Sequence, residues 1–131
     1  MKNALGFYAG KRVLLTGHTG FKGMWLSLLL LRAGAEVTGF ALDAPTEDGA
    51  ETLRRFGILK ELRDVHGDVR DMVALCRAFD EVRPEIVFHL AAQPIVRESY
   101  RQPVDTFAAN VMGTVNVLEC IRTSGTVRSA L

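Results

Sequence analysis

Three glycines, Gly17, Gly20 and Gly23, stand at intervals of three residues in the segment LLTGHTGFKGMWL (14–26). They separate a short apolar run from a longer one, a pattern typical of a strand, a tight turn and a helix. At such a turn, free backbone N–H groups and the positive end of the helix dipole point to one place, and glycine lets a phosphate approach closely. A turn that only caps a helix is the alternative. The glycines therefore predict a phosphate or pyrophosphate site.

The spacing of the glycines separates two kinds of phosphate site. A Walker A loop needs a Gly-Lys-Ser/Thr run, whereas Lys22 here stands between Phe21 and Gly23. This disfavours hydrolysis of a nucleoside triphosphate. The pattern is G-x-x-G-x-x-G rather than G-x-G-x-x-G, which indicates a different branch of dinucleotide-binding domains.

An aspartate, Asp43, follows the glycines by twenty positions, at the end of the second expected strand. A carboxylate there can accept hydrogen bonds from both ribose hydroxyls of an adenosine and would repel a 2′-phosphate. Neither Ala44 nor Pro45 is the arginine that a 2′-phosphate would require. Asp43 therefore favours NAD over NADP, although a solvated loop aspartate is the alternative interpretation.

Alternating short and long apolar segments predict the elements that position these residues. Strands are expected at 12–16, 36–42 and 85–92, more weakly near 63–67, and at the start of a fifth strand in 127–131. Helices are expected at 21–34, 71–82 and 103–123, with a short helix in 51–62 and a polar loop at 43–50. Strands separated by helices predict an α/β fold with a Rossmann-type, doubly wound parallel sheet.

Composition limits the remaining functions. The 131 residues fit one domain (1–131), and sixteen basic against fifteen acidic side chains give a net charge of +1. The basic residues are scattered, so we expect neither nucleic acid nor an anionic membrane as a partner. The longest apolar stretch, 24–31, is shorter than the roughly twenty residues of a membrane span. We expect a cytoplasmic protein.

The cysteines and His89 suggest packing rather than metal binding. Cys76 and Cys120 fall in expected helices, and the sequence contains no CxxC pair and no histidine cluster. We expect both cysteines to be reduced and partly buried, His89 to be a packed strand residue, and no metal site.

Five segments resemble a known family. VLLTGHTGFKG, ALDAPT, GDVRD, VFHLAAQPIVRESYRQP and NVMGTVNVLE are similar to the extended short-chain dehydrogenase/reductase family, with a likeness that spans 8–128. Within that family the nearest branch is the one that dehydrates CDP-glucose. GHTGFKG and HLAAQP are the most specific segments, because neighbouring dehydratases and epimerases usually show GGAGFIG or a close variant.

The resemblance implies NAD as cofactor and a role for each matching residue. Backbone around Thr19, Phe21 and Lys22 would line the pyrophosphate, Asp43 would hold the adenine ribose, and Asp68 and Val69 would flank the adenine. The stretch from Leu90 to Gln93 would pass beneath the nicotinamide ribose, and Asn110 would help organise a water and a catalytic lysine. The expected cofactor-binding residues are Gly17, Thr19, Gly20, Phe21, Lys22, Gly23, Asp43, Asp68, Val69, Leu90, Ala91, Ala92, Gln93 and Asn110.

Some of these residues have structural alternatives. Asp68 could instead cap the helix that follows it, and Asn110 could be a polar helix residue that bonds locally. Arg97, Ser99 and Tyr100 lie in an expected loop that reaches toward the sugar nucleotide in relatives, and a solvated loop is equally compatible with them.

The sequence departs from the family in its catalytic residues. The family uses a Tyr-x-x-x-Lys pair, but the positions four after Tyr8 and Tyr100 hold Arg12 and Val104. We therefore expect the amino-terminal portion of a longer enzyme, with no catalytic residue and no activity of its own. Apolar helix faces left uncovered should make it marginally stable or prone to self-association.

The resemblance also implies the reaction of the full-length relative. That reaction converts CDP-glucose, a nucleotide-sugar substrate, to CDP-4-keto-6-deoxyglucose, and the long helix would take part in a homodimer. Two alternatives stay open: a non-catalytic dinucleotide-binding module, and a related epimerase or dehydratase acting on another nucleotide sugar.

Overall fold

Five parallel strands form the centre of the protein in a computed structural model that describes residues 4–131. The strands are β1 (Arg12–Thr16), β2 (Glu36–Ala41), β3 (Arg63–His66), β4 (Ile86–His89) and β5 (Ser129–Ala130). Their spatial order is β3-β2-β1-β4-β5. Since the chain leaves β1 in one direction and returns beyond it at β4, the sheet is doubly wound, and the predicted Rossmann-type fold is confirmed.

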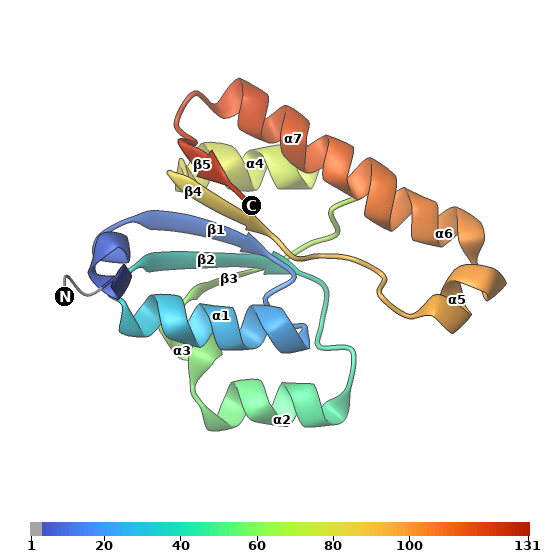
Figure 1. Cartoon of the computed structure of the whole chain (residues 1–131), viewed down its shortest axis with the longest axis horizontal. Helices are drawn as coiled ribbons and strands as arrows, with labels where there is room; N and C mark the ends of the chain where they lie inside the picture. Colours follow the sequence, from blue (N-terminus) through green and yellow to red (C-terminus); the bar gives the residue numbers. More distant parts are fainter. Residues whose placement is uncertain (1–3) are drawn as a thin grey trace.

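Helices cover both faces of the sheet (Figure 1). On one side lie α1 (Phe21–Arg32), α2 (Glu47–Arg55) and α3 (Ile58–Glu61), and on the other lie α4 (Met72–Val82) and α7 (Gly113–Ser124). A 3₁₀ helix, η1 (Ala4–Tyr8), precedes β1. With both faces covered, β1 is buried from Val13 to Thr16, which explains why Val13, Leu14 and Leu15 are apolar in succession rather than alternating with polar residues.

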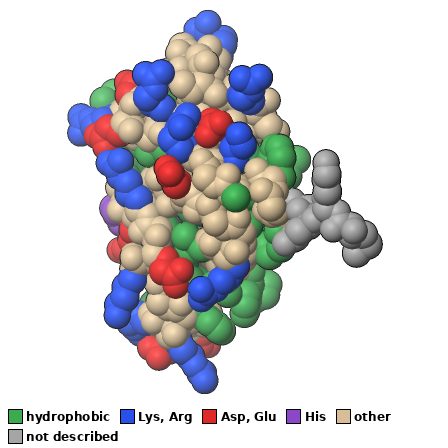
Figure 2. Space-filling view, turned by 90° about the vertical axis from the view of Figure 1, so that its left-hand side faces the viewer, with side chains coloured by type: hydrophobic (Ala, Val, Ile, Leu, Met, Phe, Trp, Pro, Cys, Tyr) green, Lys and Arg blue, Asp and Glu red, His purple; other side chains and the backbone are tan. Residues whose placement is uncertain are grey.

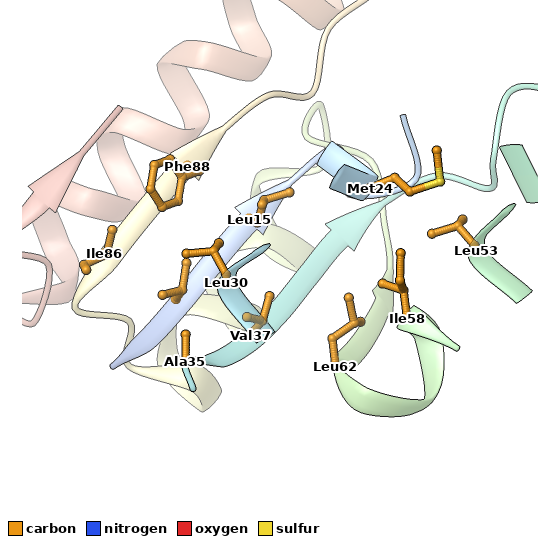
Figure 3. Packing of buried hydrophobic residues seen from close by; sticks show 11 residues of the cluster. Leu15, Met24, Leu30, Ala35, Val37, Leu53, Ile58, Leu62, Ile86 and Phe88 are labelled. Atoms are coloured by element: carbon orange, nitrogen blue, oxygen red, sulfur yellow. The ribbon is translucent and has the colours of Figure 1, made fainter. Parts of the chain in front are cut away.

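The core on the α1 side draws on both secondary-structure types. Leu15, Val37 and Phe88 project from the sheet toward Leu30 of α1, and Ile58 of α3 closes one end (Figure 3). A second core on the other face contains Leu14, Phe40, Phe79 and Val117. The central strands therefore feed side chains alternately to two cores.

Two segments expected as loops are helical. The polar loop predicted at 43–50 ends early because α2 begins at Glu47, capped by Thr46, whose hydroxyl accepts from Gly49 N at 3.1 Å. The segment of Arg97, Ser99 and Tyr100 forms α5 (Val96–Arg101).

The fourth strand, β4 (Ile86–His89), is shorter than the predicted 85–92.

The helix predicted at 103–123 is interrupted by a π-helical turn. It consists of α6 (Pro103–Phe107), the turn η2 (Ala108–Met112) and α7. Its apolar stripe faces outward rather than into the core, with exposed side chains at Val104, Phe107, Val111, Val115 and Leu118. The residues of α7 that face the sheet are Gly113, Asn116, Val117 and Cys120. An apolar helix face is thus uncovered, as the sequence leads one to expect.

The cysteines differ from the sequence-based expectation. Cys76 of α4 and Cys120 of α7 form a disulfide, with Cα atoms 5.5 Å apart. The expectation of reduced thiols was wrong for this structure, because α4 and α7 pack side by side and bring the two residues together.

The surface combines charged and apolar regions. Figure 2 shows Lys, Arg, Asp and Glu side chains spread over most of the viewed face, while hydrophobic side chains gather along its right-hand side. Within residues 4–131, none of the helices has the length and apolar character required to cross a membrane.

Candidate functional site

A cavity of about 530 Å³ opens at the carboxyl ends of β1 to β4. This is the edge of the sheet at which doubly wound folds bind ligands, beside the point where strand order reverses. Its lining includes Gly17, Thr19, Gly20, Asp43, Asp68, Val69, Leu90, Ala91, Ala92 and Gln93 from the predicted set. Four predicted residues, Phe21, Lys22, Gly23 and Asn110, are not part of that lining.

The glycine turn, residues 17–23, owes its shape to close backbone contacts. Gly17 has a φ of +77°, and a Cβ there would lie 2.7 Å from the Ala91 nitrogen. A Cβ at Gly23 would overlap the Gly17 carbonyl. Larger residues at these two positions would push the turn away from β4 or away from α1, so both glycines are sterically required.

The amino end of α1 is left open for an acceptor. Gly20 is its N-cap and offers no side-chain hydrogen bond. The first amides of a helix have no partner within the helix, so, among residues 4–131, the N–H groups near Phe21, Lys22 and Gly23 are open to an anion beside the cavity.

Asp43 stands at the rim of the cavity just beyond β2. Its side chain is 96% exposed, and His66 Nδ1 lies 3.3 Å from its Oδ1. The Thr19 hydroxyl donates to the Leu42 carbonyl at 2.8 Å, which joins the glycine turn to the residue before Asp43. The turn and the carboxylate are therefore held next to each other.

Asp68 accepts hydrogen bonds from the residue two positions on. Arg70 donates to it from its backbone N at 2.9 Å and from its guanidinium at 2.6 to 3.1 Å. The Arg70 hydrogen bonds lower the pKa of Asp68, so the carboxylate is charged at neutral pH. The alternative role as a helix cap is wrong, because Asp71 caps α4 by accepting from Ala74 N at 3.0 Å.

Asn110 acts on the cavity through Gln93. Its Oδ1 accepts from Gln93 N at 2.7 Å, and its Nδ2 donates to Gln93 O at 3.0 Å. The alternative of purely local bonding by Asn110 is therefore wrong. The Gln93 side chain in turn bonds Ile95 and Thr106. Asn110 thus holds the start of the segment that carries α5 and α6.

His89 belongs to a hydrogen-bond chain at the end of β4. Its Nδ1 lies 2.7 Å from the Thr16 hydroxyl, and its Nε2 lies 3.0 Å from the Thr114 hydroxyl. Because Thr114 donates its own proton to Asn110 O, Nε2 is the donor to Thr114. Burial lowers the pKa of His89, so the ring is neutral at neutral pH and Nδ1 accepts from the Thr16 hydroxyl. The expectation of a packed strand residue is confirmed.

Sequence reasoning missed one wall of the cavity. Glu98 of α5, Gln102, and Asp105 and Thr106 of α6 all line it. Glu98 comes from α5 and Asp105 and Thr106 come from α6, and the two helices meet at the non-helical residue Gln102. The sequence signal for this wall is weak, because the four side chains lie on two short helices and the residue between them rather than on one continuous helix.

Charge in the lining is mostly negative. Asp43, Asp68, Glu98 and Asp105 face a single basic side chain, Arg70, within the described lining. Arg70 already pairs with Asp68 and Asp105, so backbone amides are the groups in the lining that are available for a phosphate. Residues 4–131 contain no group of three or more His, Cys, Asp or Glu side chains arranged to hold a metal ion.

Comparison with known proteins places this cavity in context. The family model described as GDP-mannose 4,6 dehydratase matches residues 14–130. The CDP-glucose 4,6-dehydratase of Salmonella typhimurium is 51% identical over 126 residues, which cover 95% of this chain and 34% of that relative.

Solved structures agree with the fold. The Thermus thermophilus UDP-glucose 4-epimerase in complex with NAD superimposes with a TM-score of 0.76 at 35% identity, covering 88% of this chain and 35% of the other. The Stenotrophomonas maltophila UDP-glucose-4-epimerase with bound NAD and formylated UDP-arabinopyranose superimposes with a TM-score of 0.80 at 26% identity. The match covers 92% of this chain and 35% of the other. The chain spans about a third of the length of the proteins it matches.

Proposed function

Because the chain belongs to the family described as GDP-mannose 4,6 dehydratase, we propose that it is the NAD-binding portion of a nucleotide-sugar 4,6-dehydratase acting on CDP-glucose. The observation that carries the proposal is one cavity lined by the glycine turn, Asp43 and Asp68. The 51% identity to a CDP-glucose 4,6-dehydratase supports the substrate.

The residues of the cavity fit a dinucleotide. Gly17 and Gly23 allow the turn to pack closely on Ala91 and on itself, which brings the amino end of α1 to the cavity. Asp43 would accept from the adenine ribose, and Val69, itself buried, would pack on the adenine ring. The Asp68 carboxylate has a further lone pair for the adenine amino group beside its bonds from Arg70. Leu90, Ala91 and Ala92 would leave room for the nicotinamide ribose.

In this proposal NAD supplies the redox chemistry and the protein supplies binding and orientation. Bound NAD supplies reversible hydride acceptance, so that an internal oxidation, loss of water and reduction of the sugar leave the cofactor unchanged. The chain's own residues bind and orient the dinucleotide, and Asn110 keeps Gln93 in position. Since neither tyrosine of the sequence is followed by a lysine four positions on, we propose that this chain alone does not turn over substrate.

The exposed apolar stripe along α6, η2 and α7 supports a homodimer. Val111, Val115 and Leu118 repeat at helical spacing on one face and are about half exposed, between 47% and 57%. An apolar face of this kind gains free energy when it is covered. We propose that it packs on the corresponding helix of a second copy in the full-length enzyme.

Titration with NAD and NADP tests the cofactor site. We expect NAD to bind and NADP to bind about tenfold more weakly, because Asp43 would repel a 2′-phosphate. Asp43→Asn should weaken NAD and reduce the preference. Asp48→Asn changes another aspartate, on α2 outside the cavity, and should alter neither. Failure to bind either dinucleotide, or a preference for NADP, would contradict the proposal.

A further inference from the structure

His18 lies in the glycine turn but points away from the cavity. Its side chain is fully buried and absent from the cavity lining. Its Nε2 lies 2.8 Å from Oδ1 of Asp64 on β3. A carboxylate can only accept, so Nε2 carries the proton, and Nδ1 is left without a hydrogen-bond partner in the described residues.

The unpaired Nδ1 of His18 costs stability that an apolar side chain at this position would not cost. A buried polar atom without a partner destabilises the fold, whereas an apolar side chain would fill the same space without the penalty. Burial lowers the pKa of His18, although Asp64 opposes the shift, so the ring is neutral at neutral pH. The bond from Nε2 to Asp64 is what distinguishes histidine from an apolar residue here.

The sheet leaves space for this ring at one residue of β2. A Cβ at Gly39 would overlap the imidazole of His18. The ring therefore crosses β2 at its glycine and reaches β3, two strands away from β1 in the sheet. The His18 side chain thus connects the glycine turn to β3, which does not pair with β1 in the sheet.

Three bonds hold the glycine turn on the side of β2 and β3. Gly17 N donates to Phe40 O at 2.9 Å, the Thr19 hydroxyl donates to Leu42 O, and His18 donates to Asp64. β2 ends just before Asp43, and β3 ends just before Asp68. The bonds thus fix the distance between the free amides of α1 and the two carboxylates.

We propose that His18 is a positioning residue, which holds the glycine turn against β3 through Asp64 and so sets the affinity of the cavity for the pyrophosphate of a dinucleotide. The proposal rests on the proposed function, because it needs the cavity to bind adenosine and pyrophosphate together. A ligand that spans both parts gains affinity only when both are held in register.

Two substitutions at His18 distinguish the effect of the hydrogen bond to Asp64 from the effect of a buried polar side chain. Glutamine places its amide nitrogen where Nε2 stands and can donate to Asp64, whereas asparagine places it near Nδ1, which has no partner. We expect His18→Asn to weaken ADP about tenfold, the usual range for losing a bond to a charged group, and His18→Gln to restore most of it.

Adenosine is the control ligand, because it lacks the pyrophosphate. Titrations followed by NMR should show its affinity unchanged in His18→Asn, whereas a general loss of structure would weaken adenosine and ADP alike. Thermal unfolding checks that each variant is folded at the titration temperature. Equal ADP affinity in the native chain and His18→Asn, or equal losses for both ligands, would overturn the proposal.

Asp64 provides a test at a residue outside the cavity. Asp64→Ala should weaken ADP by the same factor as His18→Asn, and the double variant should be no weaker than either single one, because both break one bond. Asp80→Ala, an exposed aspartate on α4, is the matched control. Additive losses would overturn the proposal, and so would an unaffected Asp64→Ala. A native chain that binds neither ADP nor NAD would instead overturn the proposed function, and this inference with it.

Discussion

Two walls of the same cavity are built in opposite ways. The glycine turn is held by backbone contacts too close for a Cβ and by bonds to β2 and β3. The opposite wall, which we call the arm (residues 94–107, with α5 and α6), contains no buried residue in either helix. The arm depends on Gln93 and Asn110 at its base, and on the approach of Arg70 to Asp105 at 3.7 Å.

The difference indicates which part of a ligand each wall can serve. A preformed wall binds without losing conformational entropy, which suits a cofactor that is always the same. A wall with few buried contacts opens at low free energy and suits a site that must admit and release a substrate. The apolar residues on the outside of the arm, such as Val104 and Phe107, are available for contacts with further protein.

The largest expected effect comes from Gly23→Ala in the glycine turn. The added Cβ would overlap the Gly17 carbonyl, and a backbone atom cannot move aside as a side chain can. We expect a loss of about 3 kcal/mol in the free energy of unfolding, measured with urea. Gly6→Ala, where nothing lies within 4 Å, is the control and should be neutral. Equal stability of the two variants would show that the glycine turn tolerates a Cβ, and the turn would then be no more rigidly built than the arm.

Gly39→Ala should have the next largest effect. The new methyl group meets the His18 ring, which can shift only by leaving Asp64, so we expect a loss of about 2 kcal/mol. In a chain that already carries His18→Ala, the same change at Gly39 should cost much less. Urea unfolding of all four proteins measures the coupling, and strictly additive losses would show that the ring does not contact this strand.

Asn110→Ala should loosen the arm at its base. Two hydrogen bonds to Gln93 are lost, and we expect about 1.5 kcal/mol less stability, with faster hydrogen exchange at the amides of Gln93 and Ile95. Thr106→Val removes one bond to Gln93 and should have a smaller effect. Unchanged exchange at Gln93 would show that the arm is held elsewhere.

Acidification should lower the stability of the chain without any substitution. The pKa values of His18 and His89 are lowered by burial, so below the unfolded value of 6.5 the unfolded state binds more protons. Their contribution is therefore present above pH 6.5 and is lost as the pH falls through the folded values. Thermal unfolding between pH 7.5 and 5.5 measures this, and His18→Gln should flatten the profile.

The smallest effects should come from the outer surface of the arm. Val96 and Val104 are 69% and 79% exposed, so replacing either with serine should change the free energy of unfolding of the isolated chain by less than about 0.5 kcal/mol. A loss above about 1.5 kcal/mol would show that the arm packs more tightly than its exposure indicates.

Local patterns allowed much of this protein to be predicted. The strand from Arg12 to Thr16 and the start of α1 at Phe21 lie where the sequence places them, because the apolar run and the glycines act within a few residues. Asp43 and Asp68 line the predicted cavity because parallel strands end at one edge of a sheet. Their contacts with NAD stay predictions.

The features that were missed depend on contacts between distant segments. The disulfide between Cys76 and Cys120 was missed because the packing of α4 on α7 brings together two residues that are 44 positions apart in the sequence. The helix at Val96–Arg101 was missed because its residues show no apolar stripe.

The sequence by itself determined the α/β class, the turn and the residue types at the edge of the sheet, since these depend on neighbours along the chain. Only the tertiary structure decided that Gly39 makes room for His18, that Asp64 accepts its hydrogen bond, and that Glu98 and Asp105 close the far wall. Those pairings join residues that lie apart in the sequence, and strand order and helix packing must be known before they can be seen.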